Sequence, residues 1–128
     1  MTTRRRAATP ASSSARAVLD STISEKAFQA QVVRLAKLNR WQVFHTFNSQ
    51  RSEPGFPDLV LVRDGCLIFA ELKRQYGKPS PAQRDWIQAL SLVAGTVGAS
   101  GVIGAVRVFL WMPSDWPTIE RVLAGKAS

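Results

Sequence analysis

The chain has 128 residues, of which 45% are hydrophobic, including four Trp and six Phe. This length suits one compact domain, and the apolar content is sufficient for a packed core. No apolar run reaches the roughly 20 residues of a membrane span, and no signal peptide is evident, so we expect a cytoplasmic protein without membrane association. A single Cys excludes an internal disulfide.

Basic residues outnumber acidic residues, with 17 Lys and Arg against 9 Asp and Glu, and the net charge is +8. The first 20 residues account for +3 of this charge, so residues 21–128 keep +5. Because Lys and Arg make most protein contacts to phosphates, the charge favours a polyanionic partner.

Residues 1–20 mix Arg, Ala, Ser, Thr and Pro without apolar periodicity. This composition is typical of a flexible basic arm, and it also resembles an organelle transit peptide, although nothing else in the chain indicates an organelle. We therefore predict a flexible tail over residues 1–20 and one folded domain over residues 21–128.

A helix is predicted from Ser21 to Asn39, where Thr22 and Glu25 fit a capping box and apolar residues recur at helical spacing. Helical geometry places Glu25 and Gln29 within the apolar arc. A carboxylate is costly to bury without a partner, so the position of Glu25 requires an explanation.

Three strands are predicted next. Aromatic and β-branched residues indicate a strand over residues 41–47, followed by a polar loop that ends at Pro57. Two apolar runs, 58–63 and 66–73, flank Asp64-Gly65, a dipeptide typical of tight hairpins, and should pair antiparallel. Both runs are apolar on both faces, which predicts a sheet covered by helices on each side.

The remaining elements alternate between helix and strand. Ser80, Pro81 and Gln83 form a helix start, and Gly95 is expected to end that helix. After a small-residue connector, a strand over residues 106–111 and a short helix over residues 115–123 follow. The predicted fold class is α/β, with the order α-β-β-β-α-β-α.

Asp58, Glu71 and Lys73 are charged residues within these apolar strands. Side chains alternate along a strand, so Glu71 and Lys73 share a face, and the hairpin can bring Asp58 beside them. Two carboxylates suit Mg²⁺, and a metal would offset the cost of burying them. Lys73 could orient a water and stabilise developing charge, which predicts phosphodiester hydrolysis.

The same pattern could belong to a surface hairpin whose Glu71–Lys73 pair is solvated. The apolar residues Ile68, Phe69 and Ala70 argue against this alternative. His45 lies in an aromatic strand, where a lone His is more often structural, so it is not included among the site residues. The four Trp are expected mainly in the core rather than stacked on unpaired bases.

Four short motifs extend this pattern, in the order Glu25-x-x-x-Gln29, Gly55-x-Pro57-Asp58, Glu71-x-Lys73 and Ser80-Pro81-x-Gln83-x-x-Trp86. Over residues 22–123 this order resembles the virus-type replication-repair nuclease (VRR-NUC) domain of the PD-(D/E)xK nuclease superfamily. The resemblance implies a restriction-endonuclease-like core with a mixed sheet. It also implies cleavage of DNA with Mg²⁺ or Mn²⁺, often at branched or flapped structures.

Carried over by position, the resemblance implies that Asp58 and Glu71 are metal ligands, with the Leu72 carbonyl completing the site. Lys73 would be the catalytic lysine.

Three further roles come from the resemblance. Glu25 would complete the acidic cluster or bind a second metal, and Gln29 and Gln83 would be supporting polar contacts. The chain departs from the family pattern in its longer Gly-rich segment 95–104 and in Met112, where an Arg is expected.

We therefore expect a structure-selective, metal-dependent endonuclease that serves phage or bacterial DNA replication, repair or recombination in the host cytoplasm or nucleoid. One alternative is a Holliday-junction resolvase or restriction-type endonuclease on the same fold, which would act as a homodimer. Another is a non-catalytic DNA-binding module. The intact set of Asp58, Glu71 and Lys73 favours an enzyme.

Overall fold

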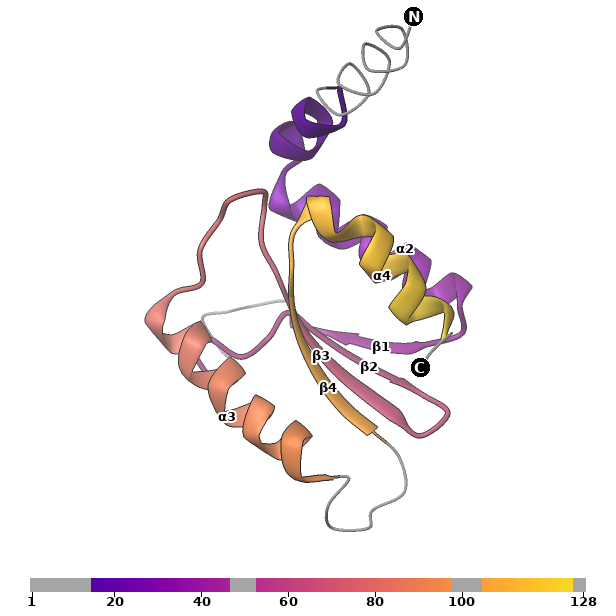
Figure 1. The fold of residues 1–128 in the computed structure, drawn as a ribbon, viewed down its shortest axis with the longest axis vertical. Coiled ribbons are helices and arrows are strands. Elements are labelled where there is room, and N and C mark those ends of the chain that lie inside the picture. The colour runs from indigo at the N-terminus through magenta and orange to yellow at the C-terminus, as the bar shows by residue number, and fades with distance from the viewer. Residues whose placement is uncertain (1–14, 47–52, 98–104, 126–128) are drawn as a thin grey trace, which may run out of the picture.

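A four-stranded mixed sheet forms the centre of the computed structural model, which describes residues 15–46, 53–97 and 105–125 (Figure 1). The strands are β1 (Gln42–His45), β2 (Leu59–Arg63), β3 (Cys66–Leu72) and β4 (Ala105–Trp111), and they lie side by side in that order. The first two pairings are antiparallel and β3 pairs with β4 in parallel. The predicted α/β class with a mixed sheet is confirmed.

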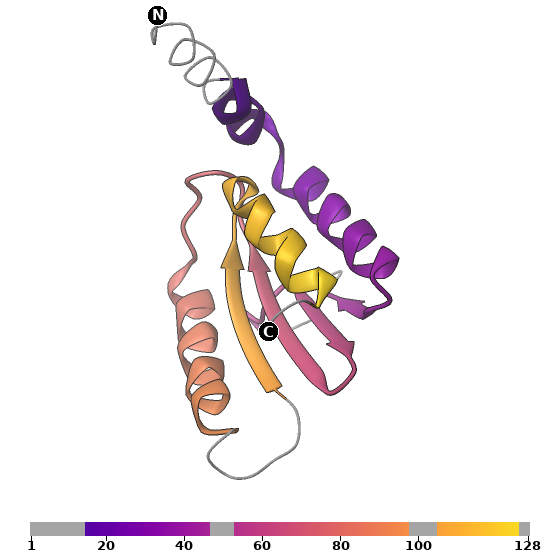
Figure 2. The same cartoon turned by 45° about the vertical axis from the view of Figure 1, so that its right-hand side comes forward.

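Helices lie on both sides of the sheet. Figures 1 and 2 show α2 (Glu25–Leu38) and α4 (Trp116–Ala124) together on one face and α3 (Pro81–Val97) on the other. A short 3-10 helix, η1 (Pro113–Asp115), precedes α4. This arrangement confirms the predicted order α-β-β-β-α-β-α. No helix in the described ranges is both long enough and apolar enough to span a membrane.

The main hydrophobic core lies between the sheet and the α2–α4 layer. Alternate strand residues point into it and are fully buried, namely Leu59, Leu61, Ile68, Ala70 and Leu72. Phe28 and Val32 from α2 and Ile119 and Leu123 from α4 pack against them. Each such side chain contributes about 1.5 to 3 kcal/mol through burial, so this face supplies most of the stability.

The opposite face is covered only in part, because α3 packs mainly against β4. Val62 on β2 is 41% exposed and Phe44 on β1 is 62% exposed. The prediction that helices cover the hairpin on both faces is therefore correct for β3 and wrong for the outer end of β2.

The hairpin turn forms as predicted. Arg63 pairs with Cys66 across Asp64 and Gly65, which have φ angles of 49° and 79°. Two consecutive positive φ angles define the turn that matches the twist of antiparallel strands, and Asp-Gly adopts it at low cost. The turn sets the register on which the position of Asp58 depends.

The predicted capping box of Thr22 and Glu25 is wrong. Ser24 caps α2 instead, since its extended backbone ends the preceding segment and its hydroxyl accepts a hydrogen bond from the Ala27 N–H at 3.0 Å. Thr22 donates to the Leu19 carbonyl at 3.1 Å. Ser and Thr are both good N-caps, and the sequence pattern did not distinguish them.

Part of the predicted flexible arm is helical. Residues 15–22 form a helix that ends two residues before α2. The rest of the predicted arm, residues 1–14, lies outside the described residues, as do Phe47 and most of the Gly-rich connector. At the other predicted boundary, α3 continues through Gly95 to Val97, because a glycine permits a helix end without requiring one.

Gly55 allows the loop before β2 to pack closely against the start of α3. This glycine has φ +88°, and a Cβ at its position would lie 2.5 Å from the backbone carbon of Ala82. The neighbouring Phe56 ring packs edge-on against Phe69 and Trp86, with centroids 6.0 and 5.0 Å away. Trp86 is thus a packing residue, as predicted.

We expect Gly55→Ala to destabilise the protein by about 2 kcal/mol or more. Ala is strained in a left-handed backbone conformation, and its Cβ would collide with main-chain atoms of Ala82 that cannot rotate away. Urea unfolding measures this loss. Gly65→Asn is the matched control, since Asn tolerates positive φ in the exposed hairpin turn. A Gly55→Ala protein as stable as wild type would contradict the close packing.

Candidate active site

Asp58 and Glu71 lie opposite each other at one end of the β2–β3 hairpin. The register pairs Leu59 with Ala70, so one more step along both strands brings Asp58 beside Glu71. The Leu72 N–H donates to Asp58 Oδ2 at 2.9 Å, and the Thr46 N–H donates to the Asp58 carbonyl at 3.0 Å. The Thr46 bond extends the β1–β2 ladder past the last residue of β1 and before the first residue of β2, and the Leu72 bond fixes the Asp58 side chain.

Lys73 projects from the same face as Glu71, as the strand alternation predicts. Its Nζ lies 3.8 Å from Glu71 Oε2. Only 1% of Glu71 is exposed, and 15% of the Lys73 side chain is exposed. The structure therefore brings together the three residues Asp58, Glu71 and Lys73, and the solvated-hairpin alternative is wrong.

Gln83 joins the first turn of α3 to Glu71. The Ser80 N–H donates to Gln83 Oε1 at 2.7 Å, and the Gln83 N–H donates to the Ser80 hydroxyl at 3.2 Å, which completes the predicted capping box. Because its oxygen is occupied, Gln83 presents its amide NH₂ to Glu71 Oε2 at 2.7 Å. One side chain thus caps a helix and orients a buried carboxylate.

The second oxygen of Glu71 has the character of a metal ligand. Glu71 Oε1 is buried and makes no hydrogen bond of good geometry with a described residue, although the Asp58 backbone N–H approaches the carboxyl group closely enough to lower its pKa. Such an atom is costly unless a cation or water completes its contacts. No three Asp, Glu, His or Cys side chains converge into a ready metal cluster in the described ranges. Mg²⁺ commonly uses one or two carboxylates plus waters, so Asp58 and Glu71 fit it.

The Leu72 carbonyl is directed to the same side as these carboxylates. The N–H and C=O of a strand residue point to the same neighbouring strand. Since the Leu72 N–H bonds to Asp58, its carbonyl also faces the Asp58 side. A main-chain oxygen is thus available where the resemblance implies one.

Glu25 and Gln29 lie on α2 and line a hollow between this helix and the end of β1. Glu25 is close enough for its charge to raise the pKa of both Asp58 and Glu71. Gln29 is one turn further along, and among the described residues no hydrogen bond joins it to the carboxylate pair. The structure thus brings Glu25 near the site, and Gln29 lines the same hollow as Glu25.

His45 was not predicted as a site residue, and the structure places it near the carboxylate pair. It pairs with Leu59 in the β1–β2 ladder, which places it next to Asp58, and it lines the same hollow as Glu25. Its charge lowers the pKa of Asp58. His45 lies next to Asp58 because β1 pairs with β2. The spacing of these two residues along the chain does not predict this.

Burial raises the pKa of both carboxyl groups. The pKa of Glu71 rises from an ordinary 4.5 to about 8, first through desolvation and then through the charge of Asp58, with Lys73 opposing both. Desolvation also raises the pKa of Asp58, while the hydrogen bond from Leu72 lowers it. Two ionised carboxylates side by side repel each other, so a cation at this position would favour their charged forms.

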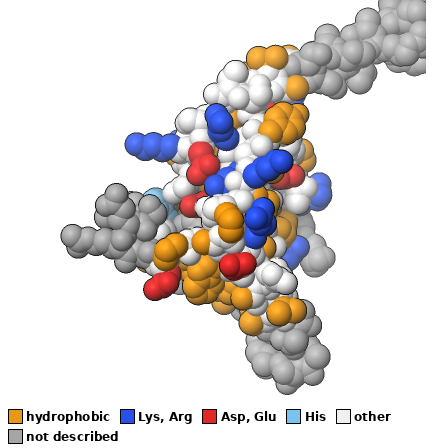
Figure 3. All heavy atoms as spheres, turned by 90° about the vertical axis from the view of Figure 1, so that its left-hand side faces the viewer, with side chains coloured by type: hydrophobic (Ala, Val, Ile, Leu, Met, Phe, Trp, Pro, Cys, Tyr) orange, Lys and Arg blue, Asp and Glu red, His pale blue; other side chains and the backbone are white. Residues whose placement is uncertain are grey.

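The face over α3 is shown in Figure 3, where acidic and basic side chains lie close together near the middle and hydrophobic side chains gather below them.

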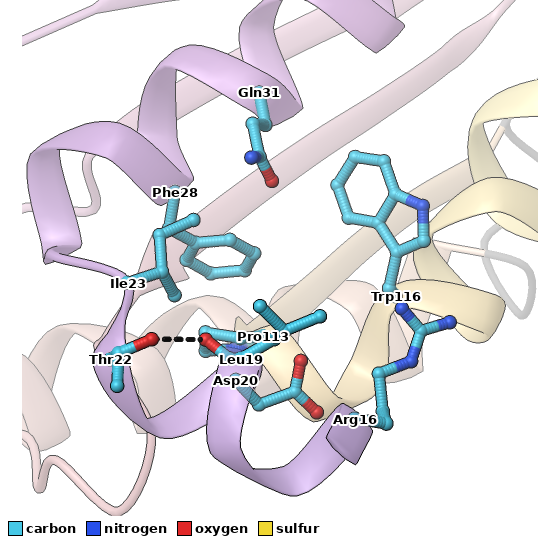
Figure 4. A pocket seen from close by; sticks show the side chains of 9 residues that line it. All are labelled: Arg16, Leu19, Asp20, Thr22, Ile23, Phe28, Gln31, Pro113 and Trp116. Atoms are coloured by element: carbon cyan, nitrogen blue, oxygen red, sulfur yellow. Dashed lines mark hydrogen bonds between the residues drawn. The ribbon is translucent and has the colours of Figure 1, made fainter. Parts of the chain in front are cut away.

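A separate hollow of about 340 Å³ is not lined by Asp58 or Glu71 (Figure 4). Side chains from helix 15–22, from α2 and from the η1–α4 turn surround it, and none of the predicted site residues lines it.

Comparison of the chain with protein-family models, with curated proteins and with solved structures finds no match.

We expect the metal-free protein to lose stability as pH rises from about 4.5 to about 8. The folded state keeps a proton on Glu71 that the unfolded chain releases at lower pH, so the stabilisation is present at low pH and disappears as Glu71 ionises. At about 1.4 kcal/mol per pKa unit, the loss is on the order of a few kcal/mol.

Glu71→Gln should remove most of this dependence, because Gln has no proton to release in this range. Urea titrations in chelator at several pH values measure it. Glu120→Gln, which changes an exposed carboxylate on α4, is the control and should follow the wild-type slope. An unchanged slope in Glu71→Gln would assign the pH dependence to other groups.

Proposed function

We propose that this protein is a metal-dependent DNA endonuclease of the PD-(D/E)xK type, with a VRR-NUC-like, restriction-endonuclease-like fold. The observation that carries the proposal is the pairing of the half-buried Asp58 with the buried Glu71, with the Lys73 ammonium 3.8 Å from Glu71. Two carboxylates and a lysine at the end of a hairpin are a costly arrangement for stability alone. Its presence beside the largely apolar β2 and β3 strands supports a chemical role.

The architecture is compatible with this proposal. An antiparallel β1–β2–β3 unit, a parallel β4 and helices on both faces agree with the mixed core that the resemblance implies. The net charge of +8 suits a DNA partner, since Lys and Arg neutralise phosphates. We assign the activity to phage or bacterial DNA replication, repair or recombination, with branched or flapped DNA as substrate.

Asp58, Glu71 and the Leu72 carbonyl would hold Mg²⁺, or Mn²⁺ in its place, with Glu25 completing the acidic cluster. The ion supplies Lewis acidity toward a phosphate oxygen when it is bound. Lys73 carries the protein's own part of the chemistry. Its ammonium orients the attacking water and stabilises the negative charge that develops on the phosphate.

Gln83 supports this chemistry by positioning. Its amide holds Glu71 Oε2 at 2.7 Å and leaves Oε1 for the ion. Since Ser80 fixes the Gln83 oxygen, the carboxylate cannot rotate freely. Restricting a ligand before the substrate arrives lowers the cost of reaching a productive geometry.

Purified protein incubated with labelled linear, splayed, flapped and four-way DNA tests the proposal in Mg²⁺, Mn²⁺ or chelator. We expect metal-dependent cleavage that falls at least about 100-fold in Asp58→Asn and Lys73→Ala. Lys78→Ala changes an exposed cation five positions after Lys73, in the following loop; it is the control and should cleave normally.

DNA binding without cleavage by the wild-type protein in every metal condition would favour the non-catalytic alternative. Symmetric incision of four-way DNA by a dimer would favour the resolvase alternative. Full activity in either site variant would remove that residue from the site.

Glu25→Gln tests the acidic residue on α2. With Ser24 as the cap, Glu25 is not required to complete a capping box. We expect cleavage to fall by orders of magnitude while stability changes by less than about 1 kcal/mol, because Gln keeps the shape and loses the charge.

Ser24→Ala is the matched comparison on the same turn. It removes the cap hydrogen bond and should cost about 1 kcal/mol of stability while cleavage remains normal. Thermal unfolding and cleavage rates are measured for both variants. A fully active Glu25→Gln protein would leave Asp58, Glu71 and Lys73 to carry the chemistry alone.

A further inference from the structure

The hollow between α2 and the end of β1 has a volume of about 840 Å³. Pockets that hold molecules of drug size are roughly 300 to 1,000 Å³. A nucleotide fits in this range, and an intact duplex is too wide to enter. Figure 1 shows α2 beside β1, on the edge of the sheet that the α3 layer does not cover.

Basic and apolar residues of α2 both line this hollow. Lys26 and Arg34 are exposed cations on α2, and Ala30 and Val33 lie between them and form an apolar surface. Cations separated by apolar surface suit a chain of phosphates that carries bases. A surface that binds only the backbone of a duplex needs cations to contact phosphates, but it does not need an apolar surface for bases.

Two further side chains suit a base. His45 contributes an aromatic ring at the β1 side, and imidazole rings stack on unpaired bases. Gln29 contributes an amide, which donates to and accepts from the edges of bases.

Two residues that line the hollow link it to the carboxylate pair. Thr46 lines it, and the Thr46 N–H donates to the Asp58 carbonyl at 3.0 Å. Glu25 lines its other side. A strand held in the hollow would therefore continue toward Asp58.

We propose that this hollow binds an unpaired strand of the DNA substrate, with Lys26 and Arg34 on its phosphates and a base over Ala30, Val33 and His45. The inference rests on the proposed nuclease function and extends it. It explains a preference for flapped or splayed DNA, because only substrates with an unpaired arm can fill the hollow.

Filling the hollow tests the proposal. Ala30→Trp places a large side chain on its apolar wall, and Ala27→Trp places the same side chain at an exposed position of α2 that does not line it. Arg34→Ala and Lys37→Ala form a second matched pair, since Lys37 is a cation of α2 outside the hollow. Fluorescence anisotropy in chelator then measures the binding of a labelled thymidine oligonucleotide and of a blunt duplex of equal length to the full chain.

We expect Ala30→Trp and Arg34→Ala to weaken single-strand binding by about fivefold or more, with a much smaller effect on the duplex. Ala27→Trp and Lys37→Ala should change both affinities equally and slightly. Equal effects within either pair, or no single-strand binding by the wild-type protein, would overturn the inference.

Cleavage assays separate this inference from the proposed function. If the wild-type protein cuts flapped DNA and Ala30→Trp binds the single strand normally, the hollow is excluded and the nuclease remains. If Ala30→Trp and Arg34→Ala lose single-strand binding while the wild-type protein cuts no DNA under any metal condition, the proposed binding site is supported and the nuclease proposal fails.

Discussion

The burial of Glu71 beside Asp58 is the constraint on which the rest of this structure depends. Removing a carboxylate from water costs several kcal/mol after relaxation. The surrounding elements each offset part of that cost. Gln83 donates from α3, Lys73 supplies a positive charge from the same strand, and the Leu72 N–H satisfies Asp58. The second Glu71 oxygen is buried without a hydrogen bond of good geometry, and the Asp58 backbone N–H is the main-chain group close enough to lower the pKa of this carboxyl.

The two faces of the sheet differ in the side chains that they present. On the α2–α4 side, strand residues such as Leu61 and Ile68 are fully buried in a continuous apolar core. The same strands present Glu71 and Lys73 to the other side, because side chains alternate. The stable face therefore holds the backbone of the site rigid. Gly55 contributes by letting the loop approach α3 closely, which places Gln83 against Glu71.

Opposite charges are distributed around the site in a way that suits a phosphate chain. The acidic residues Asp58, Glu71 and Glu25 are close enough to affect one another electrostatically. Cations lie beside them on α2 and at Lys73. Phosphates attracted by these cations would meet a bound metal at the carboxylates, whereas acidic residues alone would repel DNA. If the proposed function holds, a bound metal would offset the repulsion between the acidic residues and the phosphates at one end of the sheet.

The sequence by itself determined the elements whose causes are local. Asp64-Gly65 specified the hairpin, strand alternation put Glu71 and Lys73 on one face, and Ser80 with Gln83 marked the start of α3. Only the tertiary structure decided what meets across longer distances. The choice of Ser24 over Thr22 as cap, the approach of Gln83 to Glu71 and the position of His45 next to Asp58 depend on how separate elements pack. Spacing along the chain describes contacts within one element, and packing between elements depends on loops and shapes that spacing does not encode.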